Sequence, residues 1–252
     1  ITRAVVPSLF TTLNIFCGFL SIVSAHAGAI HEAAWFIILA GVFDSLDGMM
    51  ARITKSSSQF GVELDSLADV VSFGAAPSFM VYQAYLHQWE NWGILISAFP
   101  LIFGAIRLAR FNVQLVGFDK DHFNGLPIPA QAITLCAFVL QYYSEYSGFS
   151  QFSEIMLAPI VIVLSLLMVS RVKYDTLPKL SKKELRMHPW KFVTMITAGL
   201  LILFSKGALL FIVIGVYVFF GVVRSVVLWI RHWGQGSVQQ PSEENQITSI
   251  DI

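Results

Sequence analysis

Long runs of apolar residues, separated by short polar stretches, dominate the pattern along the chain. A helix needs roughly 20 mainly apolar residues to cross the ~30 Å hydrocarbon core of a bilayer. Eight apolar segments approach that length, at residues 9–25, 33–50, 64–86, 92–111, 128–143, 155–170, 192–204 and 208–230. The pattern therefore predicts an all-α fold, a polytopic membrane bundle of about eight transmembrane helices.

Composition agrees with a membrane protein and narrows the classes of partner. Of the 252 residues, 56% are hydrophobic and only 13% are charged, far below the charged fraction of a typical soluble domain. Sixteen basic residues balance sixteen acidic ones, so no overall field favours nucleic acid as a partner. Cys17 and Cys136 lie in apolar segments, where packing is a better interpretation than a disulfide or metal ligation.

Basic residues predict how the segments are oriented, because loops rich in lysine and arginine stay on the cytoplasmic side. With eight spans, all of the sixteen lysines and arginines except Lys206 fall on the side that holds both termini. We therefore expect an integral protein of the cytoplasmic (inner) membrane with both termini in the cytoplasm. A seven-span arrangement would break this charge pattern after Lys191.

Two regions differ from the apolar pattern. Residues 171–191 are basic and contain two prolines, which indicates a cytoplasmic linker or short surface helix that either sets topology or binds anionic lipid head groups. The tail at 232–252 is polar and is predicted to be disordered. We find no internal repeat in the sequence, which argues against an inverted-repeat transporter.

Carboxylates stand at the end of the second segment and the start of the third. Asp44 and Asp47 are spaced i, i+3, and Asp65 and Asp69 are spaced i, i+4, so each pair shares a helix face. The short polar connection makes the two helices antiparallel neighbours, which should bring the carboxylates together. Such mutually repelling oxygens favour hard cations, Mg²⁺ or Mn²⁺, and a pair of metal ions is the usual arrangement for phosphoryl transfer. The pattern predicts a metal site for a phosphate-bearing substrate.

Small and basic residues lie between the two carboxylate pairs. Gly48 and Ala51 leave an open helix surface where a ligand could approach the backbone, and Arg52 offers a bidentate fork for a phosphate. Gly61 would let the next helix begin tightly packed. Close helix packing is the alternative explanation for small residues in membrane helices.

The complete pattern is Asp44-x2-Asp47-Gly48-x2-Ala51-Arg52-x8-Gly61-x3-Asp65-x3-Asp69. It resembles, at every fixed position, the signature of the CDP-alcohol phosphotransferases. These are integral membrane enzymes that move a phosphatidyl or similar group from a CDP-linked donor to an alcohol and release CMP. The resemblance implies a six-helix core over residues 1–170, followed by the linker at 171–191 and two further transmembrane helices over 192–231.

The resemblance also implies roles for individual residues. The four carboxylates would hold two divalent metal ions, Mg²⁺ or Mn²⁺, and Asp69 would also act as the general base. The residues that would bind the nucleotide and diphosphate are Asn14, Gly48, Ala51, Arg52 and Gly61. Because relatives often dimerise through their membrane helices, a homodimer is expected.

Four stretches resemble one branch of the family, the membrane-type phosphatidylserine synthases. They are PSLFTTLNIFCGF from Pro7, DSLADVVSFGAAP from Asp65, RLARFN from Arg107 and FNGLPIPA from Phe123. Phosphatidylglycerophosphate synthases usually have Pro and Lys where this chain has Ser66 and Val70. The branch implies CDP-diacylglycerol as the donor and L-serine as the acceptor, with the active site at the cytoplasmic face of the membrane.

The acceptor site and the function class leave alternatives open. Arg107 and Arg110 share a helix face, and either could bind the serine carboxylate or anchor the helix at the anionic inner leaflet. Glycerol 3-phosphate and inositol are the competing acceptors. A cation transporter is the alternative outside the enzymes, and it would place its aspartates near the bilayer midplane.

Overall fold

The computed structural model describes residues 2–54, 58–116, 125–170, 172, 174 and 208–235. Its helices are α1 (Thr2–His26), α2 (Ile30–Thr54), α3 (Gln59–Asp69), η1 (Val70–Ala75), α4 (Ala76–Ala84), η2 (Leu86–Trp89), α5 (Glu90–Ser97), α6 (Phe99–Val116), α7 (Ile128–Tyr142), α8 (Gln151–Val169) and α11 (Ala208–Gln235). A short antiparallel hairpin, β1 (Tyr143–Ser144) with β2 (Gly148–Phe149), joins α7 to α8.

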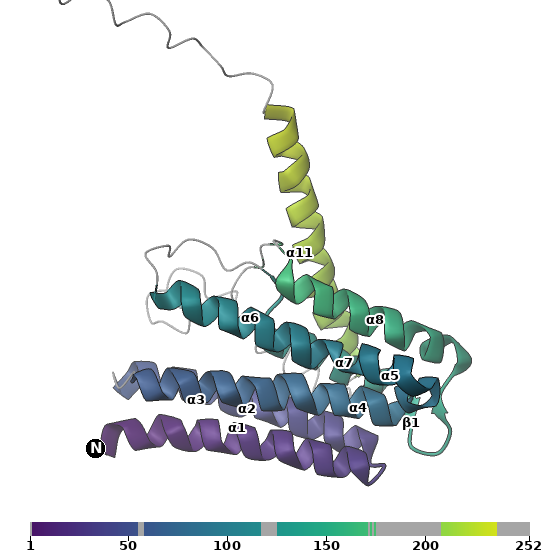
Figure 1. Cartoon of the computed structure of the whole chain (residues 1–252), viewed down its shortest axis with the longest axis horizontal. Helices are drawn as coiled ribbons and strands as arrows, with labels where there is room; N and C mark the ends of the chain where they lie inside the picture. Colours follow the sequence, from purple (N-terminus) through teal and green to yellow (C-terminus); the bar gives the residue numbers. More distant parts are fainter. Residues whose placement is uncertain are drawn as a thin grey trace, which may run out of the picture.

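Most of the long helices lie in one bundle. α1, α2, the α3–η1–α4 run, α6 and α8 follow a common direction, whereas α11 crosses them at a steep angle (Figure 1). In the described part of the chain, five helical stretches are long and apolar enough to cross a membrane: Ser8–His26, Ile30–Ala51, Gln59–Ala84, Leu86–Val113 and Gln151–Val169. The protein is therefore a polytopic helical membrane protein.

Five of the eight predicted segments fall on these stretches. The predicted segments at 128–143 and 208–230 correspond to shorter apolar helices, Ile128–Tyr142 and Leu210–Arg224. The predicted segment at 192–204 lies outside the described residues, so the count of eight stays a prediction.

The two polar regions predicted from the sequence are also only partly described by the structure. Of the predicted linker at 171–191, only Val172 and Tyr174 are described. Of the predicted disordered tail at 232–252, only residues 232–235 are described, and there the helical backbone of α11 continues to Gln235. A helix already formed extends at little cost, since each added residue gains a backbone hydrogen bond.

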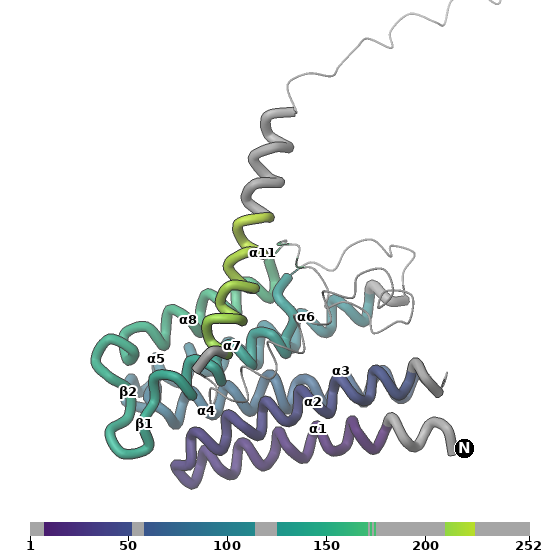
Figure 2. Tube along the Cα trace, turned by 180° about the vertical axis from the view of Figure 1, so that it is seen from behind, coloured from purple at the N-terminus to yellow at the C-terminus, as the bar shows by residue number. Residues whose placement is uncertain are grey.

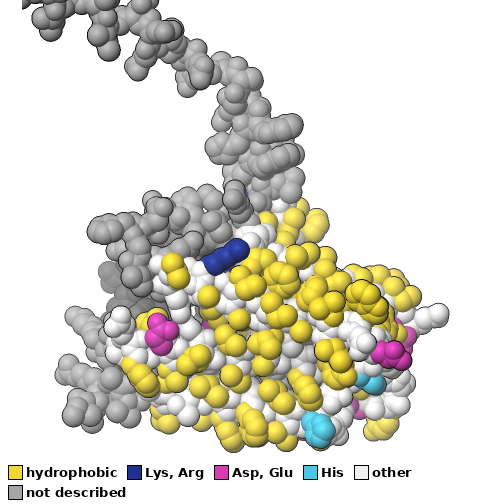
Figure 3. Space-filling view, in the orientation of Figure 1, with side chains coloured by type: hydrophobic (Ala, Val, Ile, Leu, Met, Phe, Trp, Pro, Cys, Tyr) yellow, Lys and Arg dark blue, Asp and Glu magenta, His cyan; other side chains and the backbone are white. Residues whose placement is uncertain are grey.

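The outer surface of the bundle is apolar, as contact with lipid requires. Large hydrophobic side chains on several helices are strongly exposed, including Phe19 (55%), Trp92 (69%) and Phe152 (71%). Figure 3 shows apolar side chains over most of one face, with acidic side chains toward its two ends. In water such a surface would favour aggregation, so the exposed side chains suit a hydrocarbon surrounding.

The third span is not one regular α-helix, a feature that the apolar pattern did not predict. Between α3 and α4 the six residues of η1 form a π-helix, and the Ala76 N–H donates to the Val71 carbonyl, five residues back. Pro77 follows in the first turn of α4 and has no N–H to bond Phe73, which makes the wider turn less costly there. Because the π-helix begins directly after Asp69, it sets how the carboxylate-bearing α3 continues into α4.

At the start of α2, far from the carboxylates in its C-terminal half, His31 joins the bundle to the hairpin. The His31 backbone N–H donates to Glu145 Oε1 at 2.8 Å, and the ring Nε2 contacts the Tyr143 carbonyl at 2.9 Å. The ring Nδ1 also lies 3.7 Å from Glu145 Oε1. These contacts join the turn between α1 and α2 to the connection between α7 and α8.

Gly18 of α1 packs against η1 with no room for a side chain. A Cβ there would lie 2.5 Å from Ser72 Oγ and 2.8 Å from the Ser72 Cα. We expect Gly18→Ala to lower the free energy of unfolding by about 1–3 kcal/mol, because overpacking must push α1 away from η1. Thermal unfolding of the purified protein measures this. Gly215→Ala is the control, since a Cβ there meets nothing within 4 Å, and an equal loss in both variants would contradict the packing argument.

Candidate metal centre

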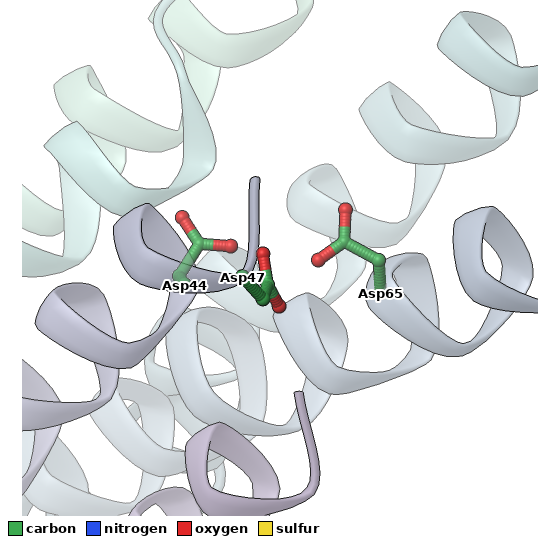
Figure 4. Close-up of side chains that lie close together, drawn as sticks. All are labelled: Asp44, Asp47 and Asp65. Carbon is green, nitrogen blue, oxygen red and sulfur yellow. The ribbon is translucent and has the colours of Figure 1, made fainter. Parts of the chain in front are cut away.

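Three carboxylates converge where α2 and α3 approach each other. Asp44 and Asp47 come from the C-terminal half of α2 and Asp65 from α3, and ligand oxygens from all three lie within 4.8 Å of one another. Figure 4 shows the side chains turned toward the same small space. Asp69, the fourth predicted ligand, is not one of these three, but it follows Asp65 by one turn on α3 and lies within electrostatic range of Asp44. The i, i+3 and i, i+4 spacings explain this locally, since each pair shares a helix face.

The cluster is buried and incompletely paired. Asp47 and Asp69 expose only 7% and 9% of their surface. Asp65 Oδ1 and Asp69 Oδ1 are buried and have no hydrogen-bond partner among the described residues. Buried carboxylates this close repel each other unless cations or protons neutralise them. An all-oxygen donor set of this charge is compatible with divalent metal ions such as Mg²⁺ or Mn²⁺.

Thr11 of α1 also belongs to the site, although the sequence analysis did not select it. Its Oγ1 donates a hydrogen bond of 2.9 Å to Asp47 Oδ2, and the residue is 4% exposed. The Gly48 backbone also hydrogen-bonds the Asp47 carboxylate. The signal in the sequence was the place of Thr11 three residues before Asn14, on the same helix face. Thr11 therefore orients one carboxylate of the cluster from a third helix.

We expect Thr11→Val to weaken Mn²⁺ binding about tenfold, because partners that orient ligating groups typically contribute 10- to 100-fold to metal affinity. Valine keeps the shape of threonine but cannot donate to Asp47. Calorimetric titration of the purified protein with Mn²⁺ measures the change. Thr12→Val is the matched control, since Thr12 Oγ1 donates to the Ser8 carbonyl of its own helix and is exposed. The same loss in both variants would rule out the Asp47 contact as the cause.

Asn14 lies inside the bundle beside η1. It is 0% exposed, and its backbone carbonyl accepts a hydrogen bond of 2.9 Å from Ser72 Oγ. Its amide Oδ1 and Nδ2 have no partner within the described ranges. A buried amide without partners is costly, so Asn14 has unused capacity to bind a polar ligand.

The small residues predicted for the nucleotide site lie around the same helix ends. Gly48 and Ala51 are half-buried on α2. Gly61 lies in the first turn of α3, where its N–H donates to Oγ of the N-cap residue Ser58 at 3.0 Å. Arg52 has its backbone in α2, but its side chain lies outside the described residues. The structure therefore supports the place of Gly61 at the N-terminal end of α3. Binding of a phosphate by the Arg52 side chain stays a prediction.

The two candidate arginines of α6 differ in their surroundings. Arg107 is partly buried and lies within electrostatic range of Asp69, whereas Arg110 is exposed. Arg107 Nε is buried and lacks a partner within the part of the chain that the structure describes. Of the two arginines, Arg107 is therefore the one positioned to act at the site. Asn112, further along α6, binds α3 directly, because its Nδ2 donates to Ser66 Oγ at 3.0 Å.

The family of CDP-alcohol phosphatidyltransferases matches residues 4–167, which include all four carboxylates. The chain belongs to this family. As a CDP-alcohol phosphotransferase it is an enzyme, and the matched part ends before α11 begins.

Several relatives of this phosphotransferase share much of its length. The CDP-diacylglycerol–serine O-phosphatidyltransferase of Helicobacter pylori strain J99 is 35% identical over 225 residues, 89% of this chain and 92% of the relative. The protein of the same name from Bacillus subtilis is 35% identical over 185 residues, 73% of this chain and 98% of the relative. The archaetidylserine synthase of Methanothermobacter thermautotrophicus is 41% identical over 170 residues, 67% of this chain and 68% of the relative.

Proposed function

We propose that this enzyme is a phosphatidylserine synthase, which transfers the phosphatidyl group from CDP-diacylglycerol to the hydroxyl of L-serine and releases phosphatidylserine and CMP. The observation that carries the proposal is the buried carboxylate cluster, held at the signature spacing within the family-matched part of the chain. The names of the Helicobacter pylori and Bacillus subtilis relatives support serine as the acceptor.

Asp69 is the general base in this proposal. A serine hydroxyl is too weakly acidic to attack at neutral pH without a proton acceptor. Asp69 is buried beside Asp44 and carries a buried oxygen with no partner among the described residues. It would take the hydroxyl proton as the serine oxygen bonds to the phosphorus that carries diacylglycerol. The bond from that phosphorus to the CMP oxygen breaks at the same time, and CMP leaves with the electron pair.

The remaining residues bind and orient in this scheme. Asp44, Asp47, Asp65 and Asp69 would hold two divalent metal ions, which supply positive charge to the diphosphate when bound. The nucleotide and diphosphate would contact Asn14, Gly48, Ala51, Arg52 and Gly61. On the acceptor side, Arg107 would bind the serine carboxylate through paired N–H groups, while the exposed Arg110 would face the lipid head groups.

We also propose how the enzyme sits in the membrane. The proposed enzyme has eight spans with both termini in the cytoplasm. Its core is formed by six helices over residues 1–170, and it forms a homodimer. The distribution of basic residues supports this orientation, since all but Lys206 would be cytoplasmic. The active site at the cytoplasmic face would let acyl chains stay in hydrocarbon while the cytidine diphosphate meets water.

The place of the carboxylates disfavours the competing transporter function. A cation pathway would place aspartates near the bilayer midplane. Asp44 and Asp47 instead lie toward the end of the stretch Ile30–Ala51, and Asp65 lies in the first turns of the stretch Gln59–Ala84. This position favours a site at the membrane interface.

Serine-dependent release of CMP by the purified protein tests the proposed function. The protein would be supplied with CDP-diacylglycerol, Mg²⁺ or Mn²⁺, and one acceptor: L-serine, glycerol 3-phosphate or inositol. We expect CMP and phosphatidylserine to form with L-serine alone. CMP release with glycerol 3-phosphate or inositol but not with serine would show that the assignment of serine as the acceptor is wrong. No CMP release with any of the three acceptors would refute the proposal.

A further inference from the structure

A hydrogen bond joins α6 to the helix that carries two of the predicted metal ligands. Asn112 Nδ2 on α6 donates to Ser66 Oγ on α3 at 3.0 Å, and both residues are partly buried. Ser66 directly follows Asp65 and lies three residues before Asp69. Its hydroxyl also donates to the Val62 carbonyl of α3 at 3.1 Å. The contact with α6 therefore lies in the turn of α3 between the two carboxylates.

α6 and the α3–η1–α4 run are joined at a second place, away from the carboxylates. There the Leu101 N–H of α6 donates to Ser78 Oγ of α4 at 3.1 Å. Leu101 also packs against Gly74 of η1, where an added Cβ would lie 3.3 Å from Leu101 Cδ1. This end is held by packing as well as by a hydrogen bond, so the contact between Asn112 and Ser66 matters chiefly for the other end, where α3 lies.

α3 has few other neighbours that could fix its rotation about its own axis. Apart from η1, which continues it, α3 packs mainly against α1 among the described helices. It lies between α1 and α6 (Figure 1 and Figure 2). Phe60, Val62 and Leu67 of α3 are exposed and contribute little packing. The rotation of α3 is therefore set by α1 on one side and by the contact with Asn112 on the other.

That rotation decides where the carboxylates of α3 point. Asp47 of α2 is oriented by Thr11 through a hydrogen bond of 2.9 Å. Asp65 Oδ1 and Asp69 Oδ1 are buried and have no hydrogen-bond partner among the residues that the structure describes. Successive residues of an α-helix are about 100° apart around its axis, so a turn of α3 that carried Ser66 away from α6 would also carry Asp65 away from the cluster.

We infer that Asn112 is a positioning residue, which holds α3 through Ser66 at the rotation that directs Asp65 into the metal centre. The inference rests on the proposed function, because it requires the carboxylate cluster to bind divalent metal. Thr11 acts on Asp47 directly, whereas Asn112 acts on Asp65 through the helix that carries it. Each ligand-bearing helix is thus tied to a different neighbour, α2 to α1 and α3 to α6, and the metal affinity depends on both contacts.

The test is Mn²⁺ binding to the metal-free protein, measured by calorimetric titration in the absence of substrates. We expect Ser66→Ala and Asn112→Leu each to weaken Mn²⁺ binding about fivefold, the effect of about one hydrogen bond. The double variant should bind Mn²⁺ no more weakly than either single variant, because both substitutions remove the same contact. Losses that multiply in the double variant, or an unchanged Mn²⁺ affinity in either single variant, would overturn the inference.

Two control variants separate positioning from a general effect on folding. Ser78→Ala removes a hydrogen bond of similar length between the same run and α6, but nine residues after Asp69. It should lower the temperature of thermal unfolding and leave the Mn²⁺ affinity within about twofold of the unsubstituted protein. Ser66→Thr keeps the hydroxyl, so it should also stay within about twofold. Mn²⁺ binding weakened in either control as much as in Ser66→Ala would contradict the inference.

Serine-dependent CMP release by the unsubstituted protein is scored separately. A protein that binds Mn²⁺ but releases no CMP refutes the proposed function, while its variants still decide the role of Asn112. A protein that binds no Mn²⁺ refutes the metal centre and the positioning role together.

Discussion

Asp69→Asn should lower kcat for CMP release by about 10³-fold while CDP-diacylglycerol still binds. The amide has nearly the shape of the carboxylate, so the buried site keeps its packing, but it cannot accept the proton of the serine hydroxyl. Asp69 is 9% exposed, which leaves little room for water to replace it as a base. Single-turnover CMP release gives the chemical step, and equilibrium binding of CDP-diacylglycerol gives the donor affinity.

Glu63→Gln is the matched control for this prediction. Glu63 is a carboxylate on the same helix α3, but it is exposed and is not part of the group of candidate metal ligands. We expect its kcat to stay within about twofold of the unsubstituted enzyme, as for most surface substitutions. An Asp69→Asn enzyme with unchanged kcat would remove the general-base assignment. An equal loss in Glu63→Gln would mean that overall charge, rather than proton transfer, explains the effect.

Removal of divalent metal should reduce CMP release to background, and added Mg²⁺ or Mn²⁺ should restore it. The physical reason is the carboxylate cluster, where Asp44, Asp47 and Asp65 place ligand oxygens within 4.8 Å of one another. Without cations these charges would repel both each other and the diphosphate of the donor. The measurement is CMP release after dialysis against a chelator and after titration with each metal. Activity that survives chelation would refute a metal-dependent mechanism.

Asp44→Ala should raise the concentration of Mg²⁺ that gives half-maximal activity by at least about tenfold, because a ligand is lost together with its charge. Ser45→Ala is the matched control, since Ser45 is exposed on α2 and its Oγ donates to the Gly41 carbonyl of its own helix at 2.9 Å. A metal requirement that stays the same in Asp44→Ala would exclude Asp44 as a ligand.

The helices of this protein could be predicted well because their signal is local. An apolar run of sufficient length forces a helix in lipid, since each backbone group must find its partner within the segment. This rule predicted the five long stretches. It predicted neither the π-helix after Asp69 nor the residue at which α11 ends. Pro77, in the first turn of α4, lacks the N–H that would bond Phe73, and a hydropathy pattern does not register the loss of one backbone donor.

The candidate site was predictable where its members share a helix and less so where they come from different helices. Asp44 and Asp47 could be paired by counting residues along α2. Thr11 could not be assigned to Asp47 in this way, because 36 residues separate them and only the packing of α1 beside α2 brings them together. Arg107 and Arg110 were equivalent by spacing, and the rotation of α6 about its axis distinguishes them.

The amino-acid sequence is enough to predict the class of protein, the positions of the long helices, and a carboxylate signature specific enough to indicate the family. Only the packing of the helices brings together polar groups from different segments, as in the hydrogen bond from Thr11 to Asp47, and distinguishes the partly buried Arg107 from the exposed Arg110. The reason is that a membrane helix is apolar on both its lipid-facing and its interior side, so its composition does not specify its rotation or its neighbours. Packing between helices supplies that information.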